Sequence, residues 1–282
     1  MDLSLLMRLG GKSPTRKRRK GRATRPSHAA EAAYRADLLE LVGAIRKAVD
    51  EYLLPELKRY EPQYARTPTS KDSLTVRDGF ALDIMAVFDQ MAERFGGIDR
   101  VAARLARMAV ARQAEQTDRQ LSLSLANALD ISVDVTSSIR ALSAGPAVEA
   151  ATIANANLIK SLPTQFLEKS RQLTLNGVTS GRRYEDVAAD IEKQLGATAS
   201  RAKLIARDQM AKVNAAITEA KQSALGIEEY EWVTAGDERV RPSHRANNGK
   251  TFRWDDPPSA TGHPGTDVAC RCTARPIIKI EE

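Results

Sequence analysis

Two histidines and two cysteines near the C-terminus are the residues of this chain best suited to chemistry. His244, His263, Cys270 and Cys272 all fall between Trp232 and Glu282. Imidazole nitrogen and thiolate sulfur are ligands that suit tetrahedral zinc, and four of them would close a structural site. A short, loop-rich module with few aliphatic residues would gain folding free energy from such a metal. The sequence therefore offers these four residues as a zinc site.

The spacing of the cysteines leaves other interpretations open. Only Arg271 separates Cys270 from Cys272, whereas zinc sites usually have two to four residues between paired cysteines. The two thiols could instead be a buried core pair beside hydrogen-bonded histidines. A disulfide between them would be strained, given the distances that the bond tolerates. Zinc, a core pair and a disulfide are thus three alternatives, and no other cofactor is indicated.

Enzymatic chemistry is a second hypothesis for the same region. His244 could act as a general base that Asp237 orients, with His263 nearby, in a metal-dependent nuclease or hydrolase. A ββα-metal nuclease could also use Asn247 and Asn248. However, the chain has no adjacent pair of histidines, and one tight cysteine pair replaces the two pairs that often brace such folds. We therefore expect no enzyme and keep the nuclease as the alternative.

An architectural role accounts for the same residues more simply. An Asp–Arg network could pin a strand to a loop, because paired guanidinium and carboxylate groups have a specific geometry. The tryptophans would then form the apolar core of the module, and the glycines and prolines would fix its turns. The residues predicted to build this structural motif are Trp232, Asp237, Arg239, Arg241, His244 and Gly249.

Basic residues concentrate in the N-terminal arm. Residues 1–30 contain nine Lys or Arg and one Asp, whereas the rest of the chain is close to neutral. Without aromatic residues among them, such side chains would contact phosphates of DNA without reading its sequence. The segment has too little apolar surface to offset its ordering entropy, so we expect it to be disordered. The alternative to DNA contact is a solvated, disordered tail or a look-alike of a nuclear-localisation signal. The predicted nucleic-acid contacts are Lys12, Arg16, Lys17, Arg18, Arg19, Lys20, Arg22 and Arg25.

Hydrophobic periodicity predicts a mostly α protein. Apolar residues at helical spacing are followed, after Gly226, by alternation typical of a half-buried strand at residues 229–234. A strand at 274–280 and an extension at 239–241 would complete a small sheet. No run of 18 apolar residues is present, so no membrane span is expected. The predicted helices cover residues 28–54, 73–95, 99–130, 131–142, 147–162, 163–176, 184–195 and 199–225.

The C-terminal half resembles a known family, the phage Mu F-like head morphogenesis proteins, which are minor head (minor capsid) proteins of tailed phages. The resemblance covers roughly Val148 to Ile280. Its motifs are Asn155–Ile159, Arg201–Asp208, Glu231–Thr234, Asp237–His244, Gly249–Phe252, Pro257-Pro258, His263–Gly265 and Cys270-Arg271-Cys272.

The resemblance implies a minor head protein that takes part in procapsid assembly. Its partners would be the portal protein and other head proteins, and its basic arm would contact packaged DNA, with a role in DNA delivery. Its location would be the capsid interior near the portal, and the host cytoplasm during assembly. A free DNA-binding protein is a third hypothesis. The expected organisation is a disordered arm (1–30), a helical N-terminal region (31–145) and a Mu F-like domain (146–282), with helices to 226 and a small α+β cap at 227–282.

Overall fold

The computed structural model describes residues 18–64 and 73–279 and divides into two compact units. The sheet unit comprises Met1–Tyr34, Ala106–Ala154 and Ala206–Glu282, within the described residues. The helical unit comprises Arg35–Leu105 and Asn155–Ile205. Four long helices contribute residues to both units, so this division does not follow the linear one expected from the sequence.

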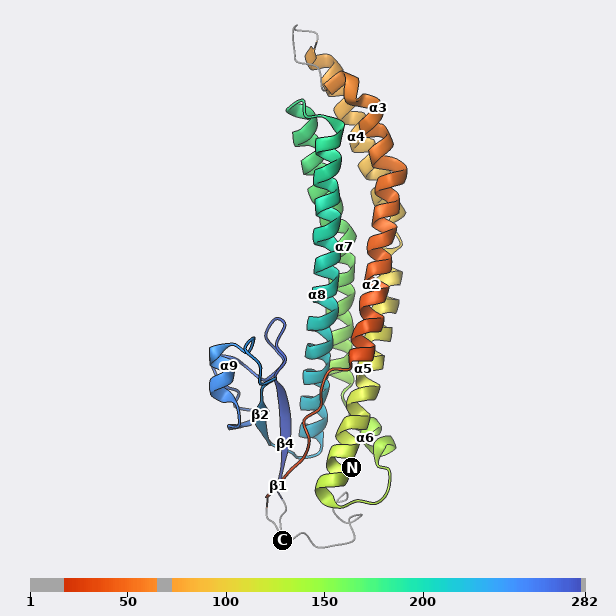
Figure 1. Ribbon diagram of the computed structural model, residues 1–282. Helices are drawn as coiled ribbons and strands as arrows, with labels where there is room; N and C mark the ends of the chain where they lie inside the picture. The colour runs from red at the N-terminus through yellow and green to blue at the C-terminus, as the bar shows by residue number, and fades with distance from the viewer. Residues whose placement is uncertain (1–17, 65–72, 280–282) are drawn as a thin grey trace. The chain divides into compact units, whose positions relative to one another are not determined.

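The predicted fold class is confirmed: the chain is mostly helical, with a small antiparallel sheet near its C-terminus (Figure 1). The helices are α2 (His28–Ala48), the π-helical turn η1 (Val49–Leu53), α3 (Leu54–Tyr64), α4 (Ser73–Arg94), α5 (Ile98–Leu129), α6 (Thr136–Ala141), α7 (Gly145–Thr179), α8 (Tyr184–Ala224) and α9 (Pro242–Asn247). The strands are β1 (Arg18–Lys20), β2 (Glu229–Val233), β3 (Thr251–Arg253) and β4 (Thr273–Lys279).

The helical unit has an aliphatic and aromatic core of its own. Leu53, Leu57, Phe88 and Phe166 are fully buried there, together with Ile191 of α8. Burying each such side chain stabilises the fold by about 1.5–3 kcal/mol relative to leaving it exposed. The apolar faces that the sequence predicted for these helices therefore form this core.

Three predicted helix breaks, at Pro55, at Pro163 and after Leu195, are wrong. At Pro55 the chain continues from α2 through η1 into α3; the amide of Leu54 bonds back to the carbonyl of Val49, five residues earlier. A π-turn of this kind loosens the spacing next to a proline, whose ring would crowd a regular helix. Helix α7 runs through Pro163, which is buried with the apolar face around it. Burial of that face outweighs the missing hydrogen bond.

Helix α8 also continues where the sequence predicted a gap after Leu195. Its buried positions keep helical spacing across that gap, because Ile191, Leu195, Thr198 and Ala202 are all buried. A Cβ added at Gly196 within this helix would meet no atom within 4 Å. An isolated helical glycine costs only about 1 kcal/mol relative to alanine. The tertiary burial of one face therefore holds the helix together.

The four strands form one antiparallel sheet with the order β1-β4-β2-β3. In its register Glu231 of β2 opposes Arg275 of β4, and Tyr230 opposes Phe252 of β3. The predicted strands at 229–234 and 274–280 are confirmed as β2 and β4. As predicted, Gly226 ends α8 in a left-handed conformation (φ +78°) just before the sheet begins. Strand β3 was not predicted.

Residues 239–241 do not extend the sheet, contrary to the prediction. They lie in a turn, and α9 starts at Pro242, where proline suits the first helical position. Arg241 precedes that proline with an extended backbone (φ −57°, ψ 145°) but has no strand partner. The alternation of Arg-Val-Arg is too short to outweigh the proline that follows it.

The described end of the basic arm is ordered, which differs from the expectation for residues 18–27. Strand β1 pairs with the C-terminal end of β4, with Arg19 opposite Ile278. The Arg19 guanidinium donates to the carbonyl of Ala128 at 2.6 Å and to Asp130 at 2.9 Å. Lys20 forms an ion pair with Glu231 of β2. The arm's charges thus meet acceptors about a hundred residues or more away in the chain.

The segment after β1 is held by polar side chains of α5 and α8. The amide of Arg22 donates to Ser124 Oγ at 2.7 Å, and that hydroxyl donates back to the Arg22 carbonyl at 2.9 Å. The hydroxyls of Thr24 and Thr218 lie 2.6 Å apart in a buried position. Backbone groups without a ladder partner are therefore satisfied by side chains.

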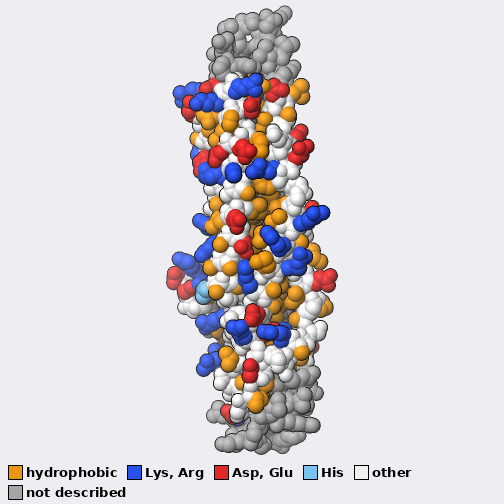
Figure 2. All heavy atoms as spheres, turned by 90° about the vertical axis from the view of Figure 1, so that its right-hand side faces the viewer, with side chains coloured by type: hydrophobic (Ala, Val, Ile, Leu, Met, Phe, Trp, Pro, Cys, Tyr) orange, Lys and Arg blue, Asp and Glu red, His pale blue; other side chains and the backbone are white. Residues whose placement is uncertain are grey.

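Surface charge is mixed. On the face shown in Figure 2, basic and acidic side chains are interspersed among hydrophobic ones, and no patch of a single sign covers it. Within the described part of the chain, no helix has the length and hydropathy that a membrane crossing requires. The face shown in Figure 2 therefore lacks the concentrated basicity of the arm.

Gly21 tests whether the ordered arm stabilises the sheet unit. A Cβ at this position would lie 2.5 Å from Ser124 Oγ and 2.8 Å from a ring carbon of Pro276. We expect Gly21→Ala to lower the free energy of unfolding by about 1–3 kcal/mol, because close-packed neighbours must shift. Urea unfolding measured by circular dichroism would report the change.

Gly145→Ala is the matched control, since it lies in the same unit and its added Cβ would meet nothing within 4 Å. We expect that variant to stay within about 0.5 kcal/mol of the wild type. Equal stability of all three proteins would contradict the docking of residues 18–27.

Candidate functional site

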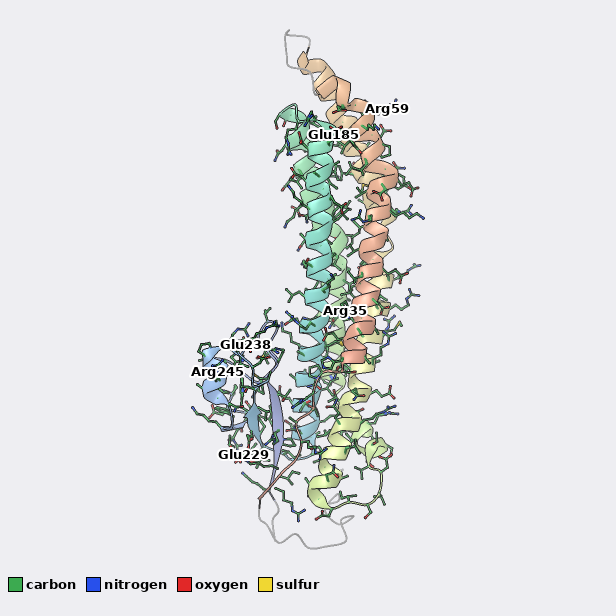
Figure 3. All side chains as sticks on the ribbon, viewed as in Figure 1. Arg35, Arg59, Glu185, Glu229, Glu238 and Arg245 are labelled. Carbon is green, nitrogen blue, oxygen red and sulfur yellow. The ribbon has the colours of Figure 1, made fainter. Side chains whose placement is uncertain are left out.

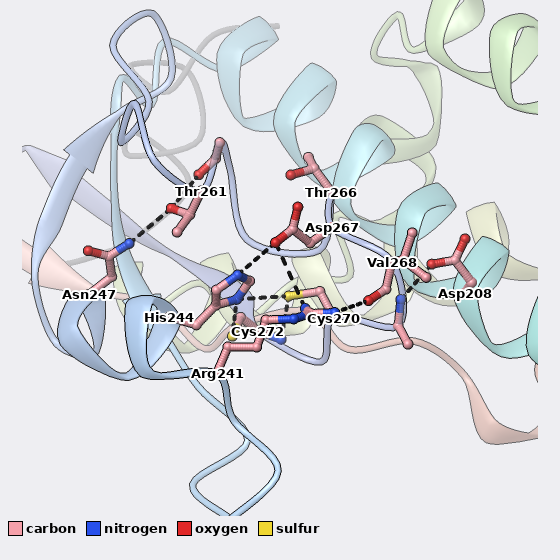
Figure 4. A network of polar contacts seen from close by, with 12 residues as sticks. Asp208, Arg241, His244, Asn247, Thr261, Thr266, Asp267, Val268, Cys270 and Cys272 are labelled. Carbon is pink, nitrogen blue, oxygen red and sulfur yellow. Dashed lines mark hydrogen bonds and ion pairs between the residues drawn. The ribbon is translucent and has the colours of Figure 1, made fainter.

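Three of the four predicted zinc ligands meet in the core of the sheet unit. His244 Nδ1 lies 3.4 Å from Cys270 Sγ and 3.5 Å from Cys272 Sγ (Figure 4). All three side chains are buried, and both thiols are free. Among the described residues, this is the one group of three or more His, Cys, Asp or Glu side chains whose ligand atoms lie close enough to hold a metal, all within 4.8 Å of one another.

Two short elements bring these side chains together. Pro242 begins α9, whose first turn points His244 inward, and the C-R-C segment leads directly into β4. Just before it, Ala269 adopts a left-handed conformation (φ +55°), which is uncommon for a residue with a side chain. Its amide donates to Asp208 Oδ1 of α8 at 2.7 Å. The strained turn is thus fixed by a charged hydrogen bond.

Asp267 orients the histidine. His244 Nε2 lies 2.9 Å from Asp267 Oδ2. An ionised carboxylate only accepts hydrogen bonds, so Nε2 carries a proton and, in the neutral ring, Nδ1 presents its lone pair to the sulfurs. The indole of Trp232 packs edge-on against the imidazole, with ring centroids 5.4 Å apart. The ring is therefore held in one orientation from two sides.

The two thiols have different proton affinities. A hydrogen bond from Cys272 lowers the pKa of Cys270 below the ordinary value for a thiol. The same bond, together with burial, raises the pKa of Cys272. Two buried sulfurs this close cannot both ionise without a compensating charge.

His263 does not join this cluster, so the predicted four-ligand site is not assembled. Its Nδ1 lies 2.9 Å from the hydroxyl of Tyr230, and its Nε2 lies 3.1 Å from the carbonyl of Trp254. The ring also packs against both aromatic side chains. His263 is thus part of an aromatic cluster on β2 and the loop after β3.

The Asp–Arg pair of the structural motif is present, with a different arginine and near the surface. Asp237 accepts two hydrogen bonds from Arg271, at 2.5 and 2.7 Å, and both side chains are partly exposed. These bonds lower the pKa of the Asp237 carboxyl. The backbone amide of Arg239 also donates to Asp237. The pair joins the loop after β2 to the C-R-C segment.

The other motif residues make structural contacts. Arg241 donates to the carbonyl of Val268 at 2.7 Å. Gly249 has φ +79°, and its amide donates to the carbonyl of Trp232 at 2.8 Å. Asn248 accepts hydrogen bonds from the amide and the hydroxyl of Thr234. Glu238 and Arg245 lie around α9 in the same part of the unit (Figure 3).

The three residues of the nuclease hypothesis are engaged with different partners. Asp237 is paired with Arg271, His244 with Asp267 and the thiols, and His263 with Tyr230. Asn247 donates to the hydroxyl of Thr261. The geometry therefore does not bring a base, an orienting carboxylate and a second histidine to one point.

The predicted DNA contacts fall into three groups. Lys12, Arg16 and Lys17 lie outside the described residues, as does the side chain of Arg18. Arg19 and Lys20 pair with groups of the sheet unit, as described above. Arg22 and Arg25 are exposed, and their backbones, not their guanidinium groups, are the parts that bond to α5.

Two residues of the site were missed by the sequence analysis. Asp267 holds the histidine, and Asp208 holds the turn before Cys270. Asp208 closes a motif that carried the family resemblance, so a signal for it existed. Asp267 lies three residues before Cys270 in a loop, where its type alone predicts a turn. Asp267 orients His244 through a contact with α9, and the spacing of residues in the sequence does not reveal that contact.

Comparison with known proteins identifies the family of the segment that contains this site. Residues 168–275 match the profile of the family described as Phage Mu protein F like protein. This segment belongs to that family; it contains the last part of α7, all of α8, then β2, α9, β3 and the first residues of β4.

Two relatives are similar to this chain over longer stretches. An uncharacterized protein of Haemophilus influenzae is 34% identical over 203 residues, which are 68% of this chain and 43% of the relative. An uncharacterized protein of Methanocaldococcus jannaschii is 31% identical over 122 residues, which are 43% of this chain and 18% of the relative. The chain thus spans less than half the length of either relative. No solved structure is significantly similar to it.

The aromatic cluster gives a prediction about alkaline pH. Burial, with a smaller contribution from Glu219, raises the pKa of Tyr230 above its ordinary value of about 10. The stability linked to this phenol is therefore present below pH ~10 and is lost as the pH rises beyond it. Tyr230 should therefore stay protonated as long as the protein is folded. With rising pH, we expect the phenolate absorbance of the native protein to increase equally in the wild type and in Tyr230→Phe.

The measurement is an ultraviolet absorbance titration, with near-ultraviolet circular dichroism to show that the fold persists. One additional phenolate in the wild type, formed while the dichroism is still native, would contradict the burial of Tyr230.

Proposed function

We propose that this chain is a minor head protein of a tailed phage that takes part in head assembly and associates with the portal. The observation that carries the proposal is the match of residues 168–275 to the Mu F-like family. The proposed partners are the portal protein and other head proteins. The proposed location is the virion interior near the portal, and the host cytoplasm during assembly.

The geometry of the C-terminal module supports an architectural role. Asp237, Arg241 and Gly249 are engaged in contacts that fix loops, as an assembly component needs. The cluster around His244 is buried and linked to Asp267. No constellation of the enzyme hypothesis converges among the described residues. A protein whose motif residues hold its own fold fits a structural component better than a hydrolase.

Quantitative mass spectrometry of purified, nuclease-treated particles tests the assembly role. We expect this protein to be present at no more than the abundance of the portal protein and far below that of the major capsid protein. Co-expression with the portal should also recover a complex, and His244→Ala should leave it intact where the variant folds. Absence from particles together with divalent-metal-dependent DNA cleavage, lost in His244→Ala, would support the nuclease instead.

Contact with packaged DNA is the second part of the proposal, and it rests on the basic arm. Lys12, Arg16 and Lys17 carry charge in a segment rich in Gly, Ser and Pro. Arg22 and Arg25 extend the basic run on the exposed side of the docked segment. Arg19 and Lys20 are paired internally and would anchor the arm to the sheet unit rather than bind phosphate.

Salt dependence tests this contact. Replacing Lys12, Arg16 and Lys17 together by glutamine should reduce the slope of log affinity for duplex DNA against log salt by about 3, at roughly 0.9 per phosphate contact. Fluorescence anisotropy with an unrelated duplex at several salt concentrations would measure it.

The matched control replaces Arg100, Arg104 and Arg107, which are exposed on α5, by glutamine. It removes the same charge from the folded body and should leave the slope almost unchanged. An equal reduction in both triple variants would show that DNA responds to net charge and would overturn the role of the arm.

A further inference from the structure

We propose that His244 Nδ1, Cys270 Sγ and Cys272 Sγ form a three-ligand zinc site whose fourth position is open to water. The site lies within the sheet unit and is independent of the proposed role in head assembly. It differs from the four-ligand site expected from the sequence, because His263 is bound elsewhere. Four lines of geometry support it.

The first is the spacing of the ligand atoms. Zinc binds imidazole nitrogen at about 2.0–2.1 Å and thiolate sulfur at about 2.3 Å, so tetrahedral angles put nitrogen and sulfur roughly 3.6 Å apart. The two observed nitrogen–sulfur distances are 3.4 and 3.5 Å. The three ligand atoms lie mutually within 4.8 Å. A zinc ion therefore fits between them with only small side-chain movements.

The second is the orientation of the histidine. A metal-binding imidazole almost always donates its other N–H to a carboxylate, a carbonyl or water, which fixes the tautomer and the ring plane. Asp267 supplies this contact at 2.9 Å to Nε2 of His244. Arg241 lies near the same carboxylate, with its NH1 3.8 Å from Asp267 Oδ2. The lone pair of Nδ1 is thus aimed at the two sulfurs.

The third is a set of N–H donors around the sulfurs. The backbone amide of Cys272 donates to Cys270 Sγ at 3.4 Å. The indole N–H of Trp232 is fully buried and, within the described chain, makes no hydrogen bond of ordinary geometry. Trp232 packs in one core cluster with both cysteines. A metal-bound thiolate at Cys272 would give this donor the acceptor that a buried N–H requires.

The fourth is space for a remaining ligand. A small hollow of about 20 Å³ is lined by the three ligands together with Arg239 and Arg241. A volume of this size holds one water molecule, which needs roughly 10–15 Å³. Two thiolates and one zinc ion have no net charge, so the neighbouring guanidinium groups would not repel the filled site strongly. Water is therefore the expected fourth ligand.

The site would join α9 to the start of β4. Zinc bound by three side chains from these two short elements would add to the contacts of Asp267 and of Asp208, which hold the intervening loop. Metal binding to a site that is absent from the unfolded chain contributes directly to folding free energy. The module would thus be more stable with zinc than without it.

Metal analysis of the full chain tests the proposal. Protein purified from a reducing cytoplasm without chelator should contain one zinc ion per chain by mass-spectrometric metal analysis. After chelation, added Co²⁺ should produce the thiolate-to-cobalt charge-transfer absorption that Co–S bonds give. Absence of both zinc and this absorption in the wild type would overturn the proposal without any variant, as would a disulfide between Cys270 and Cys272 in that protein.

Variants locate the ligands. His244→Gln, Cys270→Ser and Cys272→Ser should each abolish stoichiometric zinc, and Asp267→Asn should weaken its affinity by about 10–100-fold. His263→Gln is the matched control and should keep the full zinc content. Equal loss in His263→Gln and His244→Gln, with native circular dichroism in both, would overturn the three-ligand assignment.

Discussion

The position of β4 in the centre of the sheet is the constraint on which the rest of the sheet unit depends. Its ladder with β2 sets the register of the module, and its other edge receives β1 from the start of the described chain. Because Cys272 directly precedes β4, that register also fixes where the C-R-C segment lies. One strand therefore determines the place of both the candidate metal ligands and the ordered part of the arm.

The loop before β4 shows how a short irregular segment can be held without regular structure. Ala269 adopts a backbone conformation that costs free energy, and Asp208 of α8 offsets that cost through a charged hydrogen bond. Asp267 in the same loop reaches His244 in α9. Backbone strain and polar contacts thus occur together beside the buried thiols.

Sequence reasoning predicted most of the fold because its signals are local. Helical spacing of apolar residues, Gly226 at a helix end and the alternation around Trp232 depend only on neighbouring residues, and the elements predicted from them, the helices and β2, were found. The errors lie where tertiary contacts outweigh local rules. The chain stays helical at Pro55 because a π-helical turn precedes the proline, and at Pro163 because burial of one face compensates for a lost hydrogen bond. The arm is ordered from Arg18 because helices distant in the sequence supply its hydrogen-bond acceptors.

The sequence by itself determined the helical class, the two main strands of the cap, the concentration of charge in the arm and the resemblance to the Mu F-like family. Only the tertiary structure decided which of the four candidate ligands meet. Types and spacing treat His244 and His263 alike, but α9 directs one toward the thiols, whereas the hydroxyl of Tyr230 and the carbonyl of Trp254 bind the other. Ligand sets depend on distances between elements, and those distances follow from packing and strand register rather than from residue spacing.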